Sequence, residues 1–363
     1  MNAVRIPSLD GFRAVSIVLV LLAHLNGTGY GPDLRLVETL DLGSLGVRIF
    51  FVISGFLVTT LLELEYERNG GISIRGFLRR RAFRILPAFT IYVAAMAALN
   101  ASGMIGLHQS DVLTASTFTM NYHGDRSWYL GHLWSLSVEA QFYVCWAALR
   151  VFAGRSRMFW IAVAALAVGP AARVGTYVMV PEWRWSIGEA FPTIVDALAT
   201  GSLLAMLQGR LSSSAAYVAF LRSRLASAAV PISLVALGAT LPHIAFSYTV
   251  GQTLMNLLIA LMIHRTVVFS EGLAGRVLNA RAAVALGTVS YSLYLWQQPF
   301  LNRESASVFA QFPVNFALAI AAGLLSYSLI ERPALAAGRR MTARRPRPAA
   351  SHANGLDAHA ATI

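Results

Sequence analysis

The sequence predicts an all-α, multi-pass membrane protein, and its composition and its apolar runs are the observations that predict this fold class. Of the 363 residues, 56% are hydrophobic and only 13% are charged, whereas soluble globular domains carry about 25% charged residues. Apolar runs of about 20 residues, each long enough to cross roughly 30 Å of hydrocarbon as a helix, recur along the chain. Cys145 is the only cysteine, so we expect neither a disulfide nor a metal site.

Ten segments have the length and composition of membrane spans. They lie at 10–27, 45–64, 85–102, 133–152, 158–178, 190–208, 226–242, 245–264, 282–301 and 311–330. A shorter run at 111–120 is too brief to cross the bilayer, and we expect it to form a re-entrant or surface helix. No small-x-small cleavage site follows His24, so we expect the first segment to be a retained span and not a signal peptide.

The distribution of arginine predicts how these spans are oriented. All 29 basic residues are arginine, and the formal net charge is +12. With a cytoplasmic N-terminus, 22 arginines fall in inner segments, four in outer loops and three within spans, which agrees with the positive-inside rule. We therefore expect both termini in the cytoplasm and no nucleic-acid partner. The chain divides into a membrane domain at 1–335 and a disordered, basic cytoplasmic tail at 336–363.

The first span carries two ionisable residues, Arg13 and His24, within "SLDGFRAVSIVLVLLAHLNG" (8–27). Eleven residues turn a helix through about 1100°, so the two side chains share one face and lie roughly 16 Å apart along the axis. Ionisable residues inside a span are costly and mark candidate functional sites. Two structural alternatives stay open: Arg13 as a topology anchor, and His24 as an interfacial histidine with an ordinary hydrogen bond.

The fourth predicted span begins with "HLWSLSVEAQFYVCW" (132–146) and carries a carboxylate at membrane depth. Ser135, Glu139 and Tyr143 are spaced at i, i+4 and i+8, so they lie on one helical stripe. A carboxylate facing lipid is unfavourable, and we expect Glu139 to face the interior with His24 as its partner. The alternative for Glu139 is a purely structural hydrogen-bond acceptor.

Polar residues recur in other spans. In "GTVSYSLYLWQQPF" (287–300), Tyr294 and Gln297 lie on a stripe that runs toward the outer surface. Asp196 and Arg173 are further charges within the bundle, and we expect them to form interior ion pairs that fix the packing of the helices.

The inner loop before the third span contains a cluster of four arginines, Arg79, Arg80, Arg81 and Arg84. The positive-inside rule alone needs only one or two such charges. A cluster of guanidinium groups suits a polyphosphate ligand, because each group binds phosphate oxygens through two N–H donors. The cluster therefore predicts polyphosphate binding, with a pure topology signal as the alternative.

These stretches together resemble the integral-membrane acyltransferase-3 family, the bacterial O-acyltransferases of envelope polysaccharides and some secondary metabolites. The resemblance covers about residues 5–335. It is carried by "LDGFRA…H" with its Arg-x10-His spacing, "GVRIFFVISGFL", "RRRAFRILPAF", "LWSLSVEAQFY", "DALATGSLLA", "GTVSYSLYLW" and "SYSLIERP", which occur in this order. Two departures stand out: Gln297 replaces a family histidine, and Arg48 lies where an acidic residue is common.

The resemblance implies a multi-pass protein of the bacterial cytoplasmic membrane with acyl-CoA as the donor substrate. The acceptor would be a carbohydrate or another hydroxyl-bearing compound near the outer side. His24 would be the catalytic residue with Arg13 essential beside it, and Arg81 and Arg84 match the family's Arg-x-x-Arg.

The expected chemistry is transfer of an acyl group, expected to be acetyl, to a hydroxyl. A hydroxyl is a weak nucleophile near neutral pH, so a neutral imidazole at His24 would act as its base. Glu139 would orient this ring or the hydroxyl, and Arg13, Arg81 and Arg84 would hold the phosphates of CoA. The predicted substrate-binding residues are Ser135, Tyr143, Tyr294 and Gln297.

The alternative function is a transporter or flippase of a lipid-linked sugar. His24, Glu139 and Arg173 would then form a proton or substrate pathway through the bundle. The sequence contains no internal repeat of the kind common in transporters. The arginine cluster also favours the enzyme.

Overall fold

The computed structural model describes residues 6–240 and 242–343, and this part of the chain is helical without a β-strand. The longer helices are α1 (Pro7–Leu25), α3 (Leu42–Asn69), α4 (Ile74–Ala101), α7 (Trp134–Met179), α8 (Phe191–Ser213), α10 (Arg224–Thr240), α12 (Gln252–Val268), α14 (Arg281–Trp296), α15 (Val314–Ser326) and α16 (Arg332–Ala343). The shorter ones are α2 (Arg35–Thr39), α5 (Asp111–Ser116), η1 (Met120–Tyr122), α6 (Trp128–Gly131), η2 (Pro181–Ser186), α9 (Ala215–Arg222), α11 (Ile244–Phe246), η3 (Ser247–Gly251), α13 (Leu273–Leu278), η4 (Val308–Ala310) and η5 (Tyr327–Glu331).

Within the described residues, seven helices are long and apolar enough to cross a membrane, or eight if the bent pair α9–α10 forms one span. The protein is therefore a multi-pass membrane protein, as predicted, but the count of ten spans is not confirmed. Two predicted spans fall within the single helix α7, which is broken at Gly154, where φ is 73° and ψ is 170°. The predicted span at 282–301 forms α14, which has only 16 residues.

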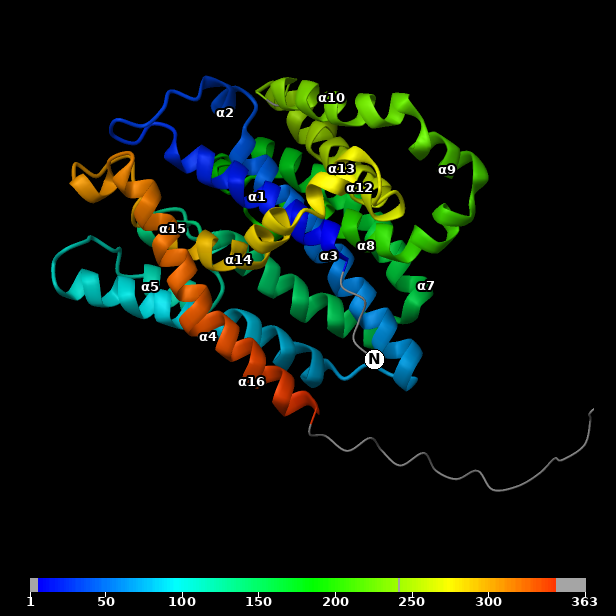
Figure 1. The fold of residues 1–363 in the computed structure, drawn as a ribbon, viewed down its shortest axis with the longest axis horizontal. Coiled ribbons are helices and arrows are strands. Elements are labelled where there is room, and N and C mark those ends of the chain that lie inside the picture. The colour runs from blue at the N-terminus through cyan, green and yellow to red at the C-terminus, as the bar shows by residue number, and fades with distance from the viewer. Residues whose placement is uncertain (1–5, 241, 344–363) are drawn as a thin grey trace, which may run out of the picture.

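Helices α3 and α8 pack against each other near the middle of the molecule, where α1, α12 and α14 also lie; α4, α15 and α16 lie on one side of this group and α9 and α10 on the other (Figure 1). Two glycines allow the close approach of α3 and α8. A Cβ atom on Gly55 would overlap the carbonyl oxygen of Leu198, and one on Gly201 would overlap that of Val52. Small residues at such crossings are typical of helix packing in membranes.

A similar close contact joins α1 to α14, the two helices that carry His24 and Gln297. A Cβ atom on Gly287 would overlap the carbonyl oxygen of Asp10, so the helices meet without intervening side chains. With one end of the pair fixed here, the opposite ends of α1 and α14 bring His24 and Gln297 together.

The prediction that Arg173 and Asp196 form interior ion pairs is confirmed, and the structure shows that they pair with each other. Their N···O distance is 3.1 Å, and both side chains are fully buried. Arg173 also donates to the carbonyl oxygen of Thr193 at 2.8 Å and to the Thr253 hydroxyl at 2.9 Å. The pair therefore joins α7, α8 and α12. The six-residue helix α5, in the run at 111–120, is too short to span a bilayer, in agreement with the prediction.

Candidate active site

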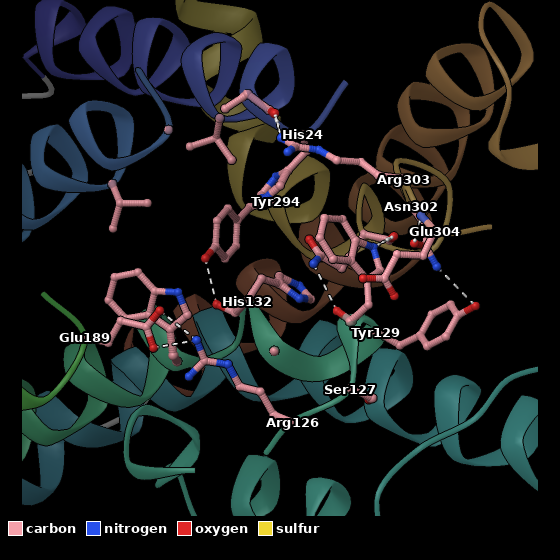
Figure 2. Close-up of a pocket in the computed structure, with 18 of the residues that line it drawn as sticks. His24, Arg126, Ser127, Tyr129, His132, Glu189, Tyr294, Asn302, Arg303 and Glu304 are labelled. Carbon is pink, nitrogen blue, oxygen red and sulfur yellow. Dashed lines mark hydrogen bonds and ion pairs between the residues drawn. The ribbon is translucent and has the colours of Figure 1, made fainter. Parts of the chain in front are cut away.

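A cavity of about 810 Å³ lies where α1, α7 and α14 end near the loops at 123–133 and 302–305. We call it the His24 cavity. Figure 2 shows the side chains that line it, among which His24, His132 and Tyr294 come from or adjoin these helices. Arg126, Glu189, Arg303 and Glu304 add both signs of charge to the wall. The cavity is large and polar enough for a hydrated ligand such as a sugar.

His24 is held by a hydrogen bond behind the cavity wall. Its Nδ1 atom lies 3.2 Å from Oε1 of Gln297, which is fully buried. An amide oxygen only accepts hydrogen bonds, so this contact requires the proton on Nδ1 and leaves the lone pair of Nε2 free. The ring also packs edge-to-face against Trp128, with 5.7 Å between centroids. Gln297 thus contacts His24, which differs from the predicted contact with substrate.

His132 is a second histidine of this cavity, and the sequence analysis did not select it. It is buried, and neither ring nitrogen has a side-chain partner among the described residues. Its ring lies 5.3 Å from that of Tyr294 and 5.5 Å from that of Tyr92, measured between centroids. The imidazole is therefore confined by aromatic rings and by the backbone of Leu295, and it forms part of the cavity wall.

Charged and aromatic loop residues complete the cavity, and these were also missed. Arg126 donates to Glu189 at 2.7 Å and lies over the ring of Trp185 at 6.0 Å. Arg303 donates to the carbonyl oxygen of Ala23, next to His24. The signal that could have found the first group is the cluster of charged, aromatic and histidine residues in "HGDRSWYLGH" (123–132).

A second, much smaller space of about 70 Å³ lies deeper among the helices, and we call it the Glu139 chamber. Glu139 accepts hydrogen bonds from the Ser54 hydroxyl, at 2.5 Å, and from the Tyr143 phenol. The expected pairing of Glu139 with His24 is therefore wrong. The two side chains line different spaces, His24 the cavity and Glu139 the chamber.

The predicted arginines converge on the Glu139 chamber. Arg13 and Arg84 line it, and the guanidinium of Arg81 lies 5.0 Å from the centroid of the Tyr143 ring. Arg13 also lies 3.7 Å from Asp10. Arg80, from the same cluster, forms an ion pair with Glu65 instead. The helical spacing of Arg13 and His24 thus places a guanidinium in one space and an imidazole in the other.

Tyr294 lines both spaces. Its hydroxyl donates to the carbonyl oxygen of His132 at 2.7 Å and lies 2.6 Å from the hydroxyl of Ser135. The predicted residues Ser135, Tyr143 and Tyr294 therefore all line the Glu139 chamber, and Tyr294 separates it from the adjoining His24 cavity.

The family whose model matches the chain is described as an acyltransferase domain, and the match covers residues 6–331. The chain belongs to this acyltransferase family. The matched region contains His24, Gln297 and the whole of the Glu139 chamber, so both spaces belong to the family domain. The resemblance inferred from the seven motifs is confirmed.

Several bacterial proteins are similar to the chain. A Staphylococcus aureus (strain COL) protein named as a putative O-acetyltransferase is 27% identical over 364 residues, which cover 90% of this chain and 57% of the relative. A putative peptidoglycan O-acetyltransferase of Bacillus subtilis (strain 168) is 26% identical over 373 residues, covering 94% and 56%. O-acetyltransferase OatA of S. aureus (strain NCTC 8325 / PS 47) is 25% identical, covering 90% and 57%. The chain thus spans somewhat more than half the length of these relatives. No solved structure matches it significantly.

Proposed function

We propose that the protein is an O-acyltransferase of the bacterial cytoplasmic membrane that moves an acetyl group from acetyl-CoA to a hydroxyl of an envelope glycan. Its membership of an acyltransferase family and the names of its relatives support acyl transfer to oxygen. The observation that carries the proposal is that Tyr294 lines both the cavity of an oriented imidazole and a chamber lined by guanidinium groups.

The proposal includes a topology of ten spans with both termini in the cytoplasm. The break at Gly154 would divide α7 into two spans, and α14 with the residues that follow it would form a short span. The excess of arginine in inner segments supports this orientation. The Glu139 chamber would then face the cytoplasm and the His24 cavity would face outward.

In the proposed reaction His24 is the general base. Nε2 of His24 takes the proton from the acceptor hydroxyl as its oxygen attacks the thioester carbonyl carbon. A new C–O bond forms, the C–S bond breaks, and the CoA thiolate takes up a proton. Gln297 is a positioning residue, because its amide oxygen keeps the other imidazole proton on Nδ1.

The donor would enter from the Glu139 chamber. Arg13, Arg81 and Arg84 would bind the phosphates of CoA, and the slender pantetheine arm would extend past Tyr294 toward His24. Glu139 would hold Ser54 and Tyr143 along this route instead of orienting His24 directly.

The test is a sided assay in proteoliposomes. Radiolabelled acetyl-CoA is added on the arginine-rich face and candidate glycans are enclosed on the other, with protein orientation determined by protease protection. The proposal requires label in the glycan. The alternative, a lipid-linked sugar flippase, requires movement of the sugar without acetylation, and that outcome would overturn the enzyme.

A further inference from the structure

Arg48 is a buried cation that the proposed reaction does not use. It lies on α3, six residues beyond the first residue of the helix, and it is 4% exposed. Its guanidinium donates to Oε1 of Gln252 at 2.5 Å and to Oδ1 of Asn256 at 3.3 Å. Both partners are neutral amides of α12, and no carboxylate among the described residues lies within ion-pair distance of Arg48. Two of its five N–H groups are used, which leaves three for a ligand.

The charges around Arg48 do not balance. Arg173 repels Arg48, whereas Asp196 and Asp41 attract it. Asp196, however, is already paired with Arg173 at 3.1 Å, and Asp41, the residue before α3, is exposed to solvent, which screens its charge. Two buried guanidinium groups therefore share one buried carboxylate. An uncompensated buried charge is unfavourable, and an anionic ligand would remove this imbalance.

Arg48 forms part of the wall of a third cavity of about 350 Å³, which we call the Arg48 pocket. Its wall also contains three carboxylates, of Glu38, Asp41 and Glu189. Glu38 and Glu189 already bind the amide of Asn26 and the guanidinium of Arg126. The remaining lone pairs of these carboxylates can accept hydrogen bonds from hydroxyl groups. Trp134 adds a flat apolar surface. Carboxylates and an aromatic ring suit a carbohydrate, while Arg48 suits an acidic group on it.

The Arg48 pocket adjoins the His24 cavity. The two share wall residues from α3, α7 and the loop before α8, namely Asp41, Ser44, Val47, Trp134 and Glu189. A ligand that extends across this shared wall would contact both His24 and Arg48. Figure 2 shows Glu189 with Arg126 on the side of the His24 cavity opposite Asn302 and Glu304.

We propose that the Arg48 pocket binds an acidic group, a carboxylate or a phosphate, on the carbohydrate that accepts the acyl group. The assignment of this carbohydrate as the acceptor rests on the proposed function, but its binding is measured without turnover. The substrate class is thus an acidic glycan, whose hydroxyl lies at His24 while its anion contacts Arg48.

The experiment measures thermal unfolding of the full-length protein in nanodiscs with glucose, glucuronate or glucose 6-phosphate, at one ionic strength set with NaCl. We expect at least one anionic sugar to raise the midpoint, with an apparent affinity about tenfold or more above that of glucose. Arg48→Gln should lose this difference in affinity. If Arg48→Gln does not fold, Arg48→Lys is measured instead, and it should keep part of the difference. The matched control is Arg265→Gln, which removes a guanidinium of α12 outside all three spaces.

Equal responses to glucose and both anions would overturn the subsite, as would a difference that persists in Arg48→Gln. A difference lost in Arg84→Gln but kept in Arg48→Gln would also overturn it, since the anion would then occupy the Glu139 chamber. Which anion responds distinguishes a uronic acid from a sugar phosphate. Binding that depends on Arg48, without transfer of label in proteoliposomes, would support the subsite and overturn the proposed reaction. Transfer of label without binding that depends on Arg48 would support the reaction and overturn the subsite.

Discussion

The spaces on the two sides of Tyr294 differ in size, in charge and in the elements that build them. The His24 cavity has a volume of about 810 Å³ and is formed largely by helix ends and loops with both signs of charge. The Glu139 chamber has about 70 Å³ and is formed by side chains within the long helices, with Arg13 and Arg84 in its wall. The first space suits a broad, hydrated acceptor, and the second suits a narrow, negatively charged donor. The contrast predicts that variants of the two spaces will affect different substrates.

The largest effect is expected for His24→Ala, because it removes the proposed base. We expect turnover to fall at least about 100-fold, the lower end of what general-base catalysis contributes. The measurement is acetyl transfer at saturating concentrations of both substrates. The control is His264→Ala, a buried histidine of α12 that contacts Tyr217 and Ser212 outside both spaces. Retention of more than about a tenth of wild-type turnover would contradict the role of His24.

The next effect concerns the donor. Arg81→Gln and Arg84→Gln should each raise the KM for acetyl-CoA about 10- to 100-fold, since a charge-assisted phosphate contact contributes about 1.5–3 kcal/mol. The KM for the acceptor should change little. Arg80→Gln is the matched control, because Arg80 belongs to the same cluster but pairs with Glu65. An unchanged donor KM at low salt, where electrostatic binding is strongest, would leave Arg81 and Arg84 with a topology role alone.

A smaller effect, on the acceptor and not on the donor, is expected from a variant of the His24 cavity. His132→Asn should raise the KM for the acceptor by about tenfold, the loss of one hydrogen bond, and leave the KM for acetyl-CoA unchanged. His264→Asn is the control, because His264 bonds to Tyr217 and Ser212 outside both spaces. A change in donor KM that equals the change in acceptor KM would remove the functional separation of the two spaces.

The smallest effect is expected for Gln297→His, which restores the residue typical of the family. If His24 alone transfers the proton, kcat/KM at neutral pH should stay within a few-fold of wild type. A second titration should enter the pH–rate profile, since an imidazole with an ordinary pKa near 6.5 joins the site. The profiles of both proteins are measured in the same nanodiscs. An inactive wild type that gains activity with histidine would show that the natural sequence has lost catalysis.

Features that depend on a single helix could be predicted from the sequence. The separation of Arg13 and His24 follows from helical rise alone, and the structure assigns the two residues to different spaces. The predicted spans match α1, α3, α4 and α8 because long apolar runs give a strong signal. The break of α7 at Gly154 lies between the spans predicted at 133–152 and 158–178, but the sequence does not fix the angle between these two apolar segments.

Features that depend on the register between helices could not be predicted in this way. One partner of Glu139 is Ser54, a residue distant in sequence whose position depends on how α3 packs against α7. The prediction missed His132, Arg126 and Trp128. It was based on ionisable residues within the spans, and these three residues lie between two spans. The contact of Gln297 with His24 depends on the close approach of α1 and α14 at Gly287.

The two hydrogen bonds of the Tyr294 hydroxyl have a consequence for the proton permeability of the membrane. An enzyme that binds one substrate from each face of the membrane needs a barrier between its two sites, because a continuous polar route would let protons cross and dissipate the membrane potential. The phenol of Tyr294, bonded to Ser135 and to the carbonyl of His132, occupies the boundary where such a leak would pass. Tyr294→Ala should therefore dissipate a pH gradient in liposomes even when no substrate is present, and a gradient as stable as that of wild type would exclude a sealing role for this residue.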